Sequence, residues 1–222
     1  MIQLKKRAWS SESFGHIVWR RFRAHRFSFF CLILLAALTL SAILAPVIAP
    51  HDPNEIAGMF SRLLYAARVS LLVGFLATVI STAIGVVLGL LSGYFGGWVD
   101  MVIMRFTDMV MSFPYILLVL VAAAIFRPGM WNIILILGFV DWPGVARLVR
   151  GSTLSLRESN FVKSSVVAGM SKAHILFSEI LPNTTAPILI YATLVLAMSM
   201  LDEAALSFLG MGVQPPMPSL GN

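Results

Sequence analysis

Long apolar runs without charged residues constrain this chain more than any other feature of its sequence. Residues 27–49 read FSFFCLILLAALTLSAILAPVIA, and residues 70–94 read SLLVGFLATVISTAIGVVLGLLSGY. A helix needs about 20 apolar residues to cross the hydrocarbon core of a bilayer. Charged residues make up only 12% of the chain, whereas an ordinary soluble domain has about 25%. The sequence therefore predicts an all-α, polytopic membrane protein.

Three further apolar segments bring the prediction to five spans. They cover residues 99–126, 130–148 and 184–211. The second span carries Gly74, Gly85 and Gly89, and small residues of this kind let another helix pack closely in a membrane. The prolines at 114 and 187 are expected to kink the third and fifth spans.

Basic residues predict the orientation of these spans. Seven of the sixteen Lys and Arg precede residue 27, and the region around residues 149–183 holds five more. The positive-inside rule then predicts that residues 1–26, 94–100 and 149–183 face the cytoplasm and that residues 50–69 form an extracytoplasmic connection. The net charge of +6 is explained by this basic head facing anionic lipid. The positive net charge therefore does not predict nucleic-acid binding.

A polar elbow, residues 158–183, interrupts the apolar runs. Asn160 is expected to cap a helix that Gly169 ends with a left-handed backbone. Ser171 is then expected to cap a second helix, which Pro182 ends. A short helix of this kind suits docking in the groove of a partner protein. From the residues alone, a helix lying at the lipid interface is an equal alternative.

The elbow resembles the signature loop of the permease subunits of ATP-binding-cassette (ABC) importers. That loop has Glu-Ala-Ala, then a glycine and, further on, Ile-Leu-Pro. Gly169 and the ILPN of Ile180–Asn183 match this pattern, whereas Lys163-Ser164-Ser165 stands where Glu-Ala-Ala is usual. The substitution replaces an acidic residue by a basic one.

Further motifs are similar to the dipeptide, oligopeptide and nickel branch of these permeases. They are FSRLLYAARVSLLVG, GLLSGYFGGWVD, MRFTDMVMSFP and EAALSFLGMGVQPPMPSLGN. The basic head and HDPNE resemble the second of the two paired permeases. The resemblance implies a type I ABC importer transmembrane domain over residues 70–222, with the elbow as its coupling helix.

The same resemblance implies the partners and the cargo. The partners would be membrane lipid, a homologous permease, a pair of ATP-binding-cassette ATPase subunits and an extracytoplasmic binding protein, in a bacterial cytoplasmic membrane. ATP and Mg²⁺ would bind the ATPases, because this chain has no GxxxxGK[ST] sequence. The chain is expected to hold no cofactor or metal of its own. The implied cargo is short peptides, with nickel or a metal chelate as the alternative.

The residues expected to contact the ATPase lie on both sides of the elbow's bend. They are Phe161, Val162, Lys163, Ser164, Ser165, Val166, Gly169, Met170 and Ser171.

Two departures concern length. Relatives carry a longer connection after Ile56 and a further, sixth span after Asn222. Either this protein is shortened at both places, or this sequence is part of a longer chain. We expect the second, because an importer half without its last span would leave helix faces uncovered.

Charged residues inside the apolar segments are candidates for the transport pathway or for structural contacts. Arg105 and Asp108 share a helix face and are expected to pair. Asp141 either lines the pathway or caps a broken helix. Asp202 and Glu203 are expected to be wetted or hydrogen-bonded to neighbouring loops, with a functional role as the alternative.

Two other classes of protein fit less well. An independent channel or secondary transporter would favour inverted repeats, and none is evident. An intramembrane enzyme would have to use Asp202 and Glu203, but adjacent helical residues point about 100° apart and do not converge. No catalytic residue is therefore assigned.

Overall fold

The computed structural model describes residue 33 and residues 36–37, 39–48 and 59–222. The chain divides into two compact units, Met1–Ile48 and Ala49–Asn222. The first contains the short helix α3 (Ala45–Ile48). The basic head and most of the predicted first span, residues 27–49, lie outside the described residues. The described residues contain helices and loops but no strand, which confirms the all-α prediction.

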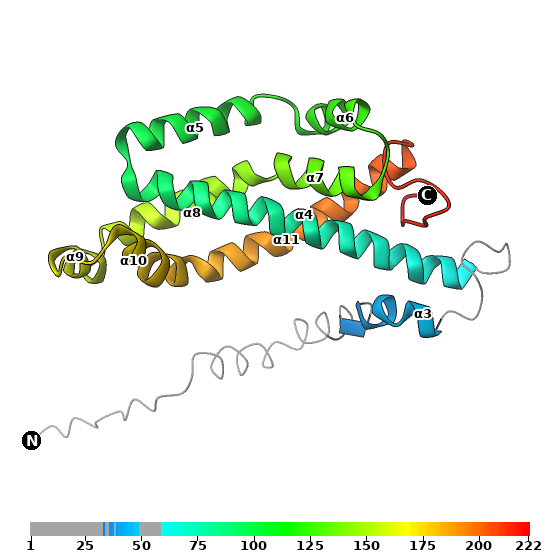
Figure 1. Cartoon of the computed structure of the whole chain (residues 1–222), viewed down its shortest axis with the longest axis horizontal. Coiled ribbons are helices and arrows are strands. Elements are labelled where there is room, and N and C mark those ends of the chain that lie inside the picture. Colours follow the sequence, from blue (N-terminus) through cyan, green and yellow to red (C-terminus); the bar gives the residue numbers. More distant parts are fainter. Residues whose placement is uncertain (1–32, 34–35, 38, 49–58) are drawn as a thin grey trace, which may run out of the picture. The chain divides into compact units, whose positions relative to one another are not determined.

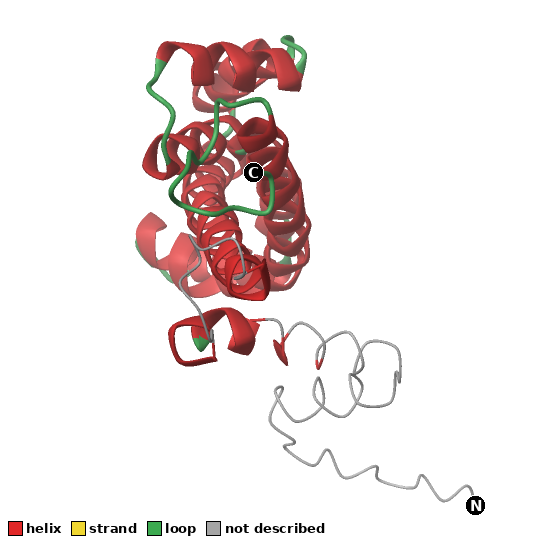
Figure 2. Ribbon diagram, turned by 90° about the vertical axis from the view of Figure 1, so that its right-hand side faces the viewer, coloured by secondary structure: helices red, strands yellow, loops and turns green. Residues whose placement is uncertain are grey.

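The second unit is a bundle of long helices joined by short breaks. Its elements are α4 (Met59–Phe95), α5 (Gly97–Met111), α6 (Tyr115–Ile125), α7 (Met130–Val140), α8 (Trp142–Arg157), α9 (Asn160–Val167), α10 (Lys172–His174), the π-helical η1 (Ile175–Ile180) and α11 (Leu181–Phe208). Figure 1 shows α4, α8 and α11 running side by side, with α9 and α10 at one end. Figure 2 looks at the other end, where the C-terminal loop lies.

Three helical stretches in the described residues are long and apolar enough to cross a membrane. They are Met59–Phe95, Met130–Arg157 and Lys172–Phe208. The second span begins earlier than predicted: residues 59–69 form the first turns of α4, not a connection. The reason is local, since FSRLLYAARV contains no proline or glycine that would stop a helix.

The predicted third span, residues 99–126, is not one helix. It consists of α5 and α6, whose axes differ in direction by 84°. Pro114 lies between them and cannot donate a hydrogen bond to the α5 ladder, while Phe113 before it is biased away from helical backbone. The expected kink is therefore a full break. Pro187, in contrast, lies inside the continuous helix α11.

Glycines of α4 form a close seam with α8. A Cβ atom at Gly85 would lie 2.4 Å from Val145 Cβ, one at Gly89 2.7 Å from Val149 Cβ, and one at Gly93 2.7 Å from Thr153 Cβ. The spacing of four residues places all three on one face of α4. Small residues at such positions allow the backbones to approach closely in a membrane. This α4–α8 seam fixes two of the three long helices against each other.

Arginines of α8 hold α5 beside it. Arg150 makes two hydrogen bonds to Asp100, each 2.6 Å long, and Arg147 Nη2 lies 2.6 Å from Asp108 Oδ1. The prediction that Asp108 pairs with Arg105 on its own helix is therefore wrong. The carboxylate instead bonds to an arginine 39 residues away, which the chain brings close through the α7–α8 connection.

Glu203 ties the C-terminal loop to the bundle. Its side chain is fully buried and accepts hydrogen bonds from Ser70 of α4 at 2.5 Å and from Ser207 at 2.7 Å. The same two hydroxyl oxygens accept from the backbone N–H groups of Leu220 and Val213. Glu203 thus lies where a neighbouring loop meets two helices.

The seam predicts opposite effects for two glycine substitutions. Gly89→Ala would place a Cβ atom 2.7 Å from the carbonyl oxygen of Ala146, so the helices must separate. We expect a loss of about 1–3 kcal/mol. Gly151→Ala is the matched control, since nothing lies within 4 Å of its Cβ position, and it should be neutral or gain up to about 1 kcal/mol. Thermal midpoints of the purified protein measure both. Equal thermal midpoints for the two variants would contradict close packing of α4 against α8.

Candidate coupling site

The elbow is a short helix followed by a tight reversal. Helix α9 begins at Asn160 with Ser159 as its cap residue, so Asn160 is the first helical residue and not the cap. Gly169 has φ +76°, which confirms the predicted left-handed end. The N–H of Met170 bonds to Ser165 O and that of Gly169 to Val166 O, the pair of bonds that closes a Schellman motif.

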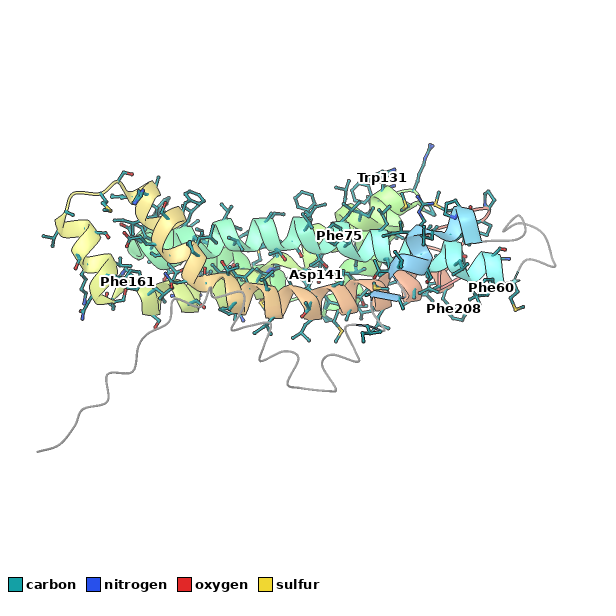
Figure 3. The ribbon with its side chains drawn as sticks, turned by 90° about the horizontal axis from the view of Figure 1, so that it is seen from below. Phe60, Phe75, Trp131, Asp141, Phe161 and Phe208 are labelled. Carbon is teal, nitrogen blue, oxygen red and sulfur yellow. The ribbon has the colours of Figure 1, made fainter. Side chains whose placement is uncertain are left out.

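One face of α9 is buried and the rest is exposed. Val162 is 1% exposed and packs with Val149 of α8, Ile175 and Ile180. Ser165 is also buried, whereas Val167 is 89% exposed and Phe161 and Val166 are exposed beside it. Figure 3 shows Phe161 at this end of the molecule. The elbow is therefore fastened by one face and presents apolar side chains on the other.

A hydrogen bond joins the two limbs of the elbow. Ser165 Oγ donates to Glu179 Oε1, 14 residues further along the chain. The second oxygen of that carboxylate, Oε2, is buried without a hydrogen-bond partner. Because the burial of an unsatisfied polar group is costly, the bond to Ser165 is important for keeping α9 against η1.

The second limb differs from its prediction. Ser171 caps it as expected, accepting a hydrogen bond from the His174 N–H. However, the helix does not end at Pro182: it continues from α10 through η1 into α11. Pro182 lacks an N–H and its ring crowds the preceding turn of an ordinary helix. The π-helical turn η1 lies directly before it, and wider turns of this type accommodate such a residue.

Three cationic side chains line a cavity at the elbow. Arg157, Lys163 and Lys172 line a cavity of about 580 Å³ together with Tyr94, Phe95 and the valines of α9. Lys163 Nζ lies 3.1 Å from Glu158 Oε2, and this hydrogen bond holds the pKa of Glu158 below its usual range. Lys172 Nζ lies 5.4 Å above the ring of Phe95. The residue that replaces the usual acid thus bonds to an acid of the same elbow.

Two of the predicted charges lie far from the elbow. Asp141 is the residue between α7 and α8, but its side chain makes no capping hydrogen bond; it accepts from Ser199 Oγ at 3.3 Å instead. Asp202 accepts a 2.6 Å hydrogen bond from the Tyr115 hydroxyl. Both carboxylates therefore face inward, toward other helices of the bundle.

Four residues make structurally important contacts that were not predicted from the sequence. They are Glu179, Tyr115, Arg147 and Arg150. Each acts through a partner between 14 and 87 residues away. One local signal was present for Glu179. The hydroxyl of Ser165 lies on the inner face of a helix, and a buried hydroxyl is normally hydrogen-bonded to a polar partner. No local signal points to the other three pairings.

Comparisons with known proteins agree with one another. Residues 85–222 match the family described as "Binding-protein-dependent transport system inner membrane component", and residues 13–67 match "N-terminal TM domain of oligopeptide transport permease C". A dipeptide transport system permease protein of Alkalihalophilus pseudofirmus is 37% identical over 91% of this chain and 74% of its own length. A glutathione transport system permease protein of Escherichia coli is 37% identical over 93% and 75%.

The bond between the limbs predicts different effects for two neighbouring serines. Ser165→Ala removes the one hydrogen-bond donor that Glu179 Oε1 has among the described residues, so the elbow should lose about 1–3 kcal/mol of stability. Ser164→Ala is the matched control, because that exposed hydroxyl bonds to the Asn160 carbonyl of its own helix and not to the second limb. Hydrogen exchange of residues 160–171 in the purified protein should be faster in the first variant alone. Equal exchange in both variants would show that the bond is unimportant.

Proposed function

This chain belongs to the family of inner membrane components of binding-protein-dependent transport systems, and we propose that, as the permease subunit of an ABC importer, it moves short peptides by alternating access. The observation that carries the proposal is the exposed apolar face of α9, which includes Val166 and Val167. This face lies on a helix whose opposite side is anchored in the bundle. An exposed apolar surface on an anchored helix suits a protein groove.

The connections of α9 suit it to transmit movement. It follows α8 after a break of two residues, and it leads through the bend at Gly169 into η1 and α11. The Ser165–Glu179 bond fixes α9 to η1, and the contacts of Val162 fix it to α8 and η1. A partner that displaces α9 therefore displaces two long helices. In this proposal, the elbow residues named from the sequence, except the buried Val162 and Ser165, bind a groove of an ATPase subunit, which supplies ATP and Mg²⁺.

The proposed complex contains this chain, a homologous permease, a pair of ATPase subunits and an extracytoplasmic binding protein. The elbow and the N-terminus face the cytoplasm. The cations at the elbow, Arg157, Lys163 and Lys172, support this orientation, because basic residues accumulate on the cytoplasmic side of membrane proteins.

The proposed cargo follows from the relatives. The Alkalihalophilus relative is named for dipeptide transport and the Escherichia coli relative for glutathione transport. Dipeptides and glutathione are both short peptides. A peptide cargo is therefore favoured over nickel or a metal chelate.

Cysteine crosslinking tests the coupling role. In a variant with Cys31→Ser, we expect Val167→Cys to crosslink to an ATPase subunit that carries a cysteine in its groove, and to do so in a nucleotide-dependent way. Val162→Cys is the control, because that side chain is 1% exposed, whereas Val167 is 89% exposed. Ser165 is a poor position for this purpose since it points inward. Crosslinks of equal yield at both positions, or none at Val167 in an assembled complex, would contradict ATPase docking on this face.

Uptake by cells that express the whole importer tests the cargo. We expect ATP-dependent uptake of labelled dialanine. Val167→Asp should reduce it about tenfold or more, because the carboxylate would be buried in an apolar contact. Gly151→Ala, a substitution on an open face of α8, should leave uptake unchanged. Uptake of nickel without uptake of dialanine would refute the peptide cargo.

A further inference from the structure

A cavity lies midway along the bundle, away from the elbow, and the exposed side chain of Phe113 lies at its edge. Its volume is about 300 Å³, and it is bounded by the break between α5 and α6, the junction of α7 and α8, and α11. Phe113, Tyr115, Asp141, Gly144 and Tyr191 are part of its wall. A space of this volume lies at the lower end of the range for small-ligand sites. The cavity is large enough for one end of a short peptide.

The packing of α4 fixes the depth of this cavity. Gly138 of α7 lies against Ile80, and Val145 of α8 lies against Gly85. Asp141, between residues 138 and 145, is therefore level with residues 80–85, the centre of the apolar run 70–94. Figure 3 shows Asp141 midway between Phe161 at one end and Phe60 and Phe208 at the other. The carboxylate lies near the middle of the membrane-spanning part.

The two carboxylates at this depth, Asp141 and Asp202, have no basic partner among the described residues. Asp100 and Asp108 each pair with an arginine of α8. Among the described residues, Asp141 and Asp202 pair with none; their recorded hydrogen-bond donors are the hydroxyls of Ser199 and Tyr115. Carboxylates within a membrane normally pair with another group or face a pathway. The two unpaired carboxylates therefore favour binding of a cation that the described part of the chain does not supply.

The wall of the cavity adds groups that bind an ammonium ion well. Phe113, Tyr115 and Tyr191 contribute aromatic rings, whose faces attract cations. The hydroxyl of Tyr191 lies 2.1 Å from where a Cβ atom of residue 144 would be, so only glycine at that position leaves room for it. Within the described residues this hydroxyl makes no hydrogen bond, and its oxygen is available as an acceptor.

We propose that this cavity binds the primary ammonium group of the transported peptide as it crosses the membrane, with Asp141 as counter-charge and the Tyr191 hydroxyl as a second acceptor. The inference rests on the proposed function, because it assigns a site in the pathway of a peptide importer. Carboxylate, hydroxyl and aromatic rings together match the three N–H donors and the positive charge of an amino terminus. A sulfonate or an acetylated amine lacks that match.

Charged thiol reagents measure this preference in the assembled importer. In membrane vesicles that hold the complete complex with Cys31→Ser, a single cysteine is introduced at Leu118 or, independently, at Met111, both of which line the cavity. Modification rates are compared for 2-aminoethyl methanethiosulfonate, an ammonium, and 2-sulfonatoethyl methanethiosulfonate, an anion. We expect the ammonium reagent to be favoured about tenfold or more, the range of electrostatic focusing in a charged cleft. Trialanine should slow the reaction, and N-acetyl-trialanine should not.

Two carboxylate variants complete the test. Asp141→Asn should abolish both the preference for the ammonium reagent and the protection by trialanine. Glu158→Gln removes the same charge from an exposed position at the elbow and should change neither. Equal rates for the two reagents, or a rate ratio that Asp141→Asn leaves unchanged, would overturn the proposal. Failure of peptide uptake by vesicles in which the rate ratio holds would instead count against the proposed function, so the two failures are distinguishable.

Discussion

The close approach of α4 and α8 is the constraint on which the rest of the structure depends. Three glycines of α4 receive Val145, Val149 and Thr153 of α8 at distances that leave no room for a Cβ atom. In lipid there is little hydrophobic force between helices, so shape complementarity of this kind determines which helices associate. Once α8 is fixed against α4, its arginines reach α5 and its C-terminal end carries α9.

The same seam connects the two functional proposals. Asp141 is the residue before α8 and Val145 is the first side chain of the seam, so the carboxylate is held at a defined depth. At the other end of α8, Arg157 donates to the carbonyl of Tyr94 at the end of α4, directly before the elbow. A force on α9 therefore acts on a unit that contains α8, α4 and one wall of the cavity. In such a unit, ATP-driven movement of the elbow would change the surroundings of the ammonium site without a separate relay.

The sequence predicted what local chemistry determines. Apolar runs predicted the membrane helices, Gly169 the left-handed bend and Ser171 the cap. The predictions were wrong where tertiary contacts determine the structure. Asp108 pairs with Arg147, and Pro182 lies within a helix beside a π-helical turn. The expected kink at Pro114 is a full break between α5 and α6. The cavity was beyond prediction for a related reason. Tyr115 lies on α6, Asp141 between α7 and α8, and Tyr191 on α11, and no periodicity of the sequence relates them.

The most direct test of this account is whether the elbow and the seam move as one body. Spin labels are placed at Val87 on the exposed face of α4 and at Val167 on α9, in the complete importer with Cys31→Ser. Their distance distribution is then measured by double electron–electron resonance with and without trapped nucleotide. The account predicts the same mean distance in both states, because the seam and the Ser165–Glu179 bond hold the elbow to the bundle. A nucleotide-dependent shift in that mean would show that the elbow moves independently of α4, and would contradict the account.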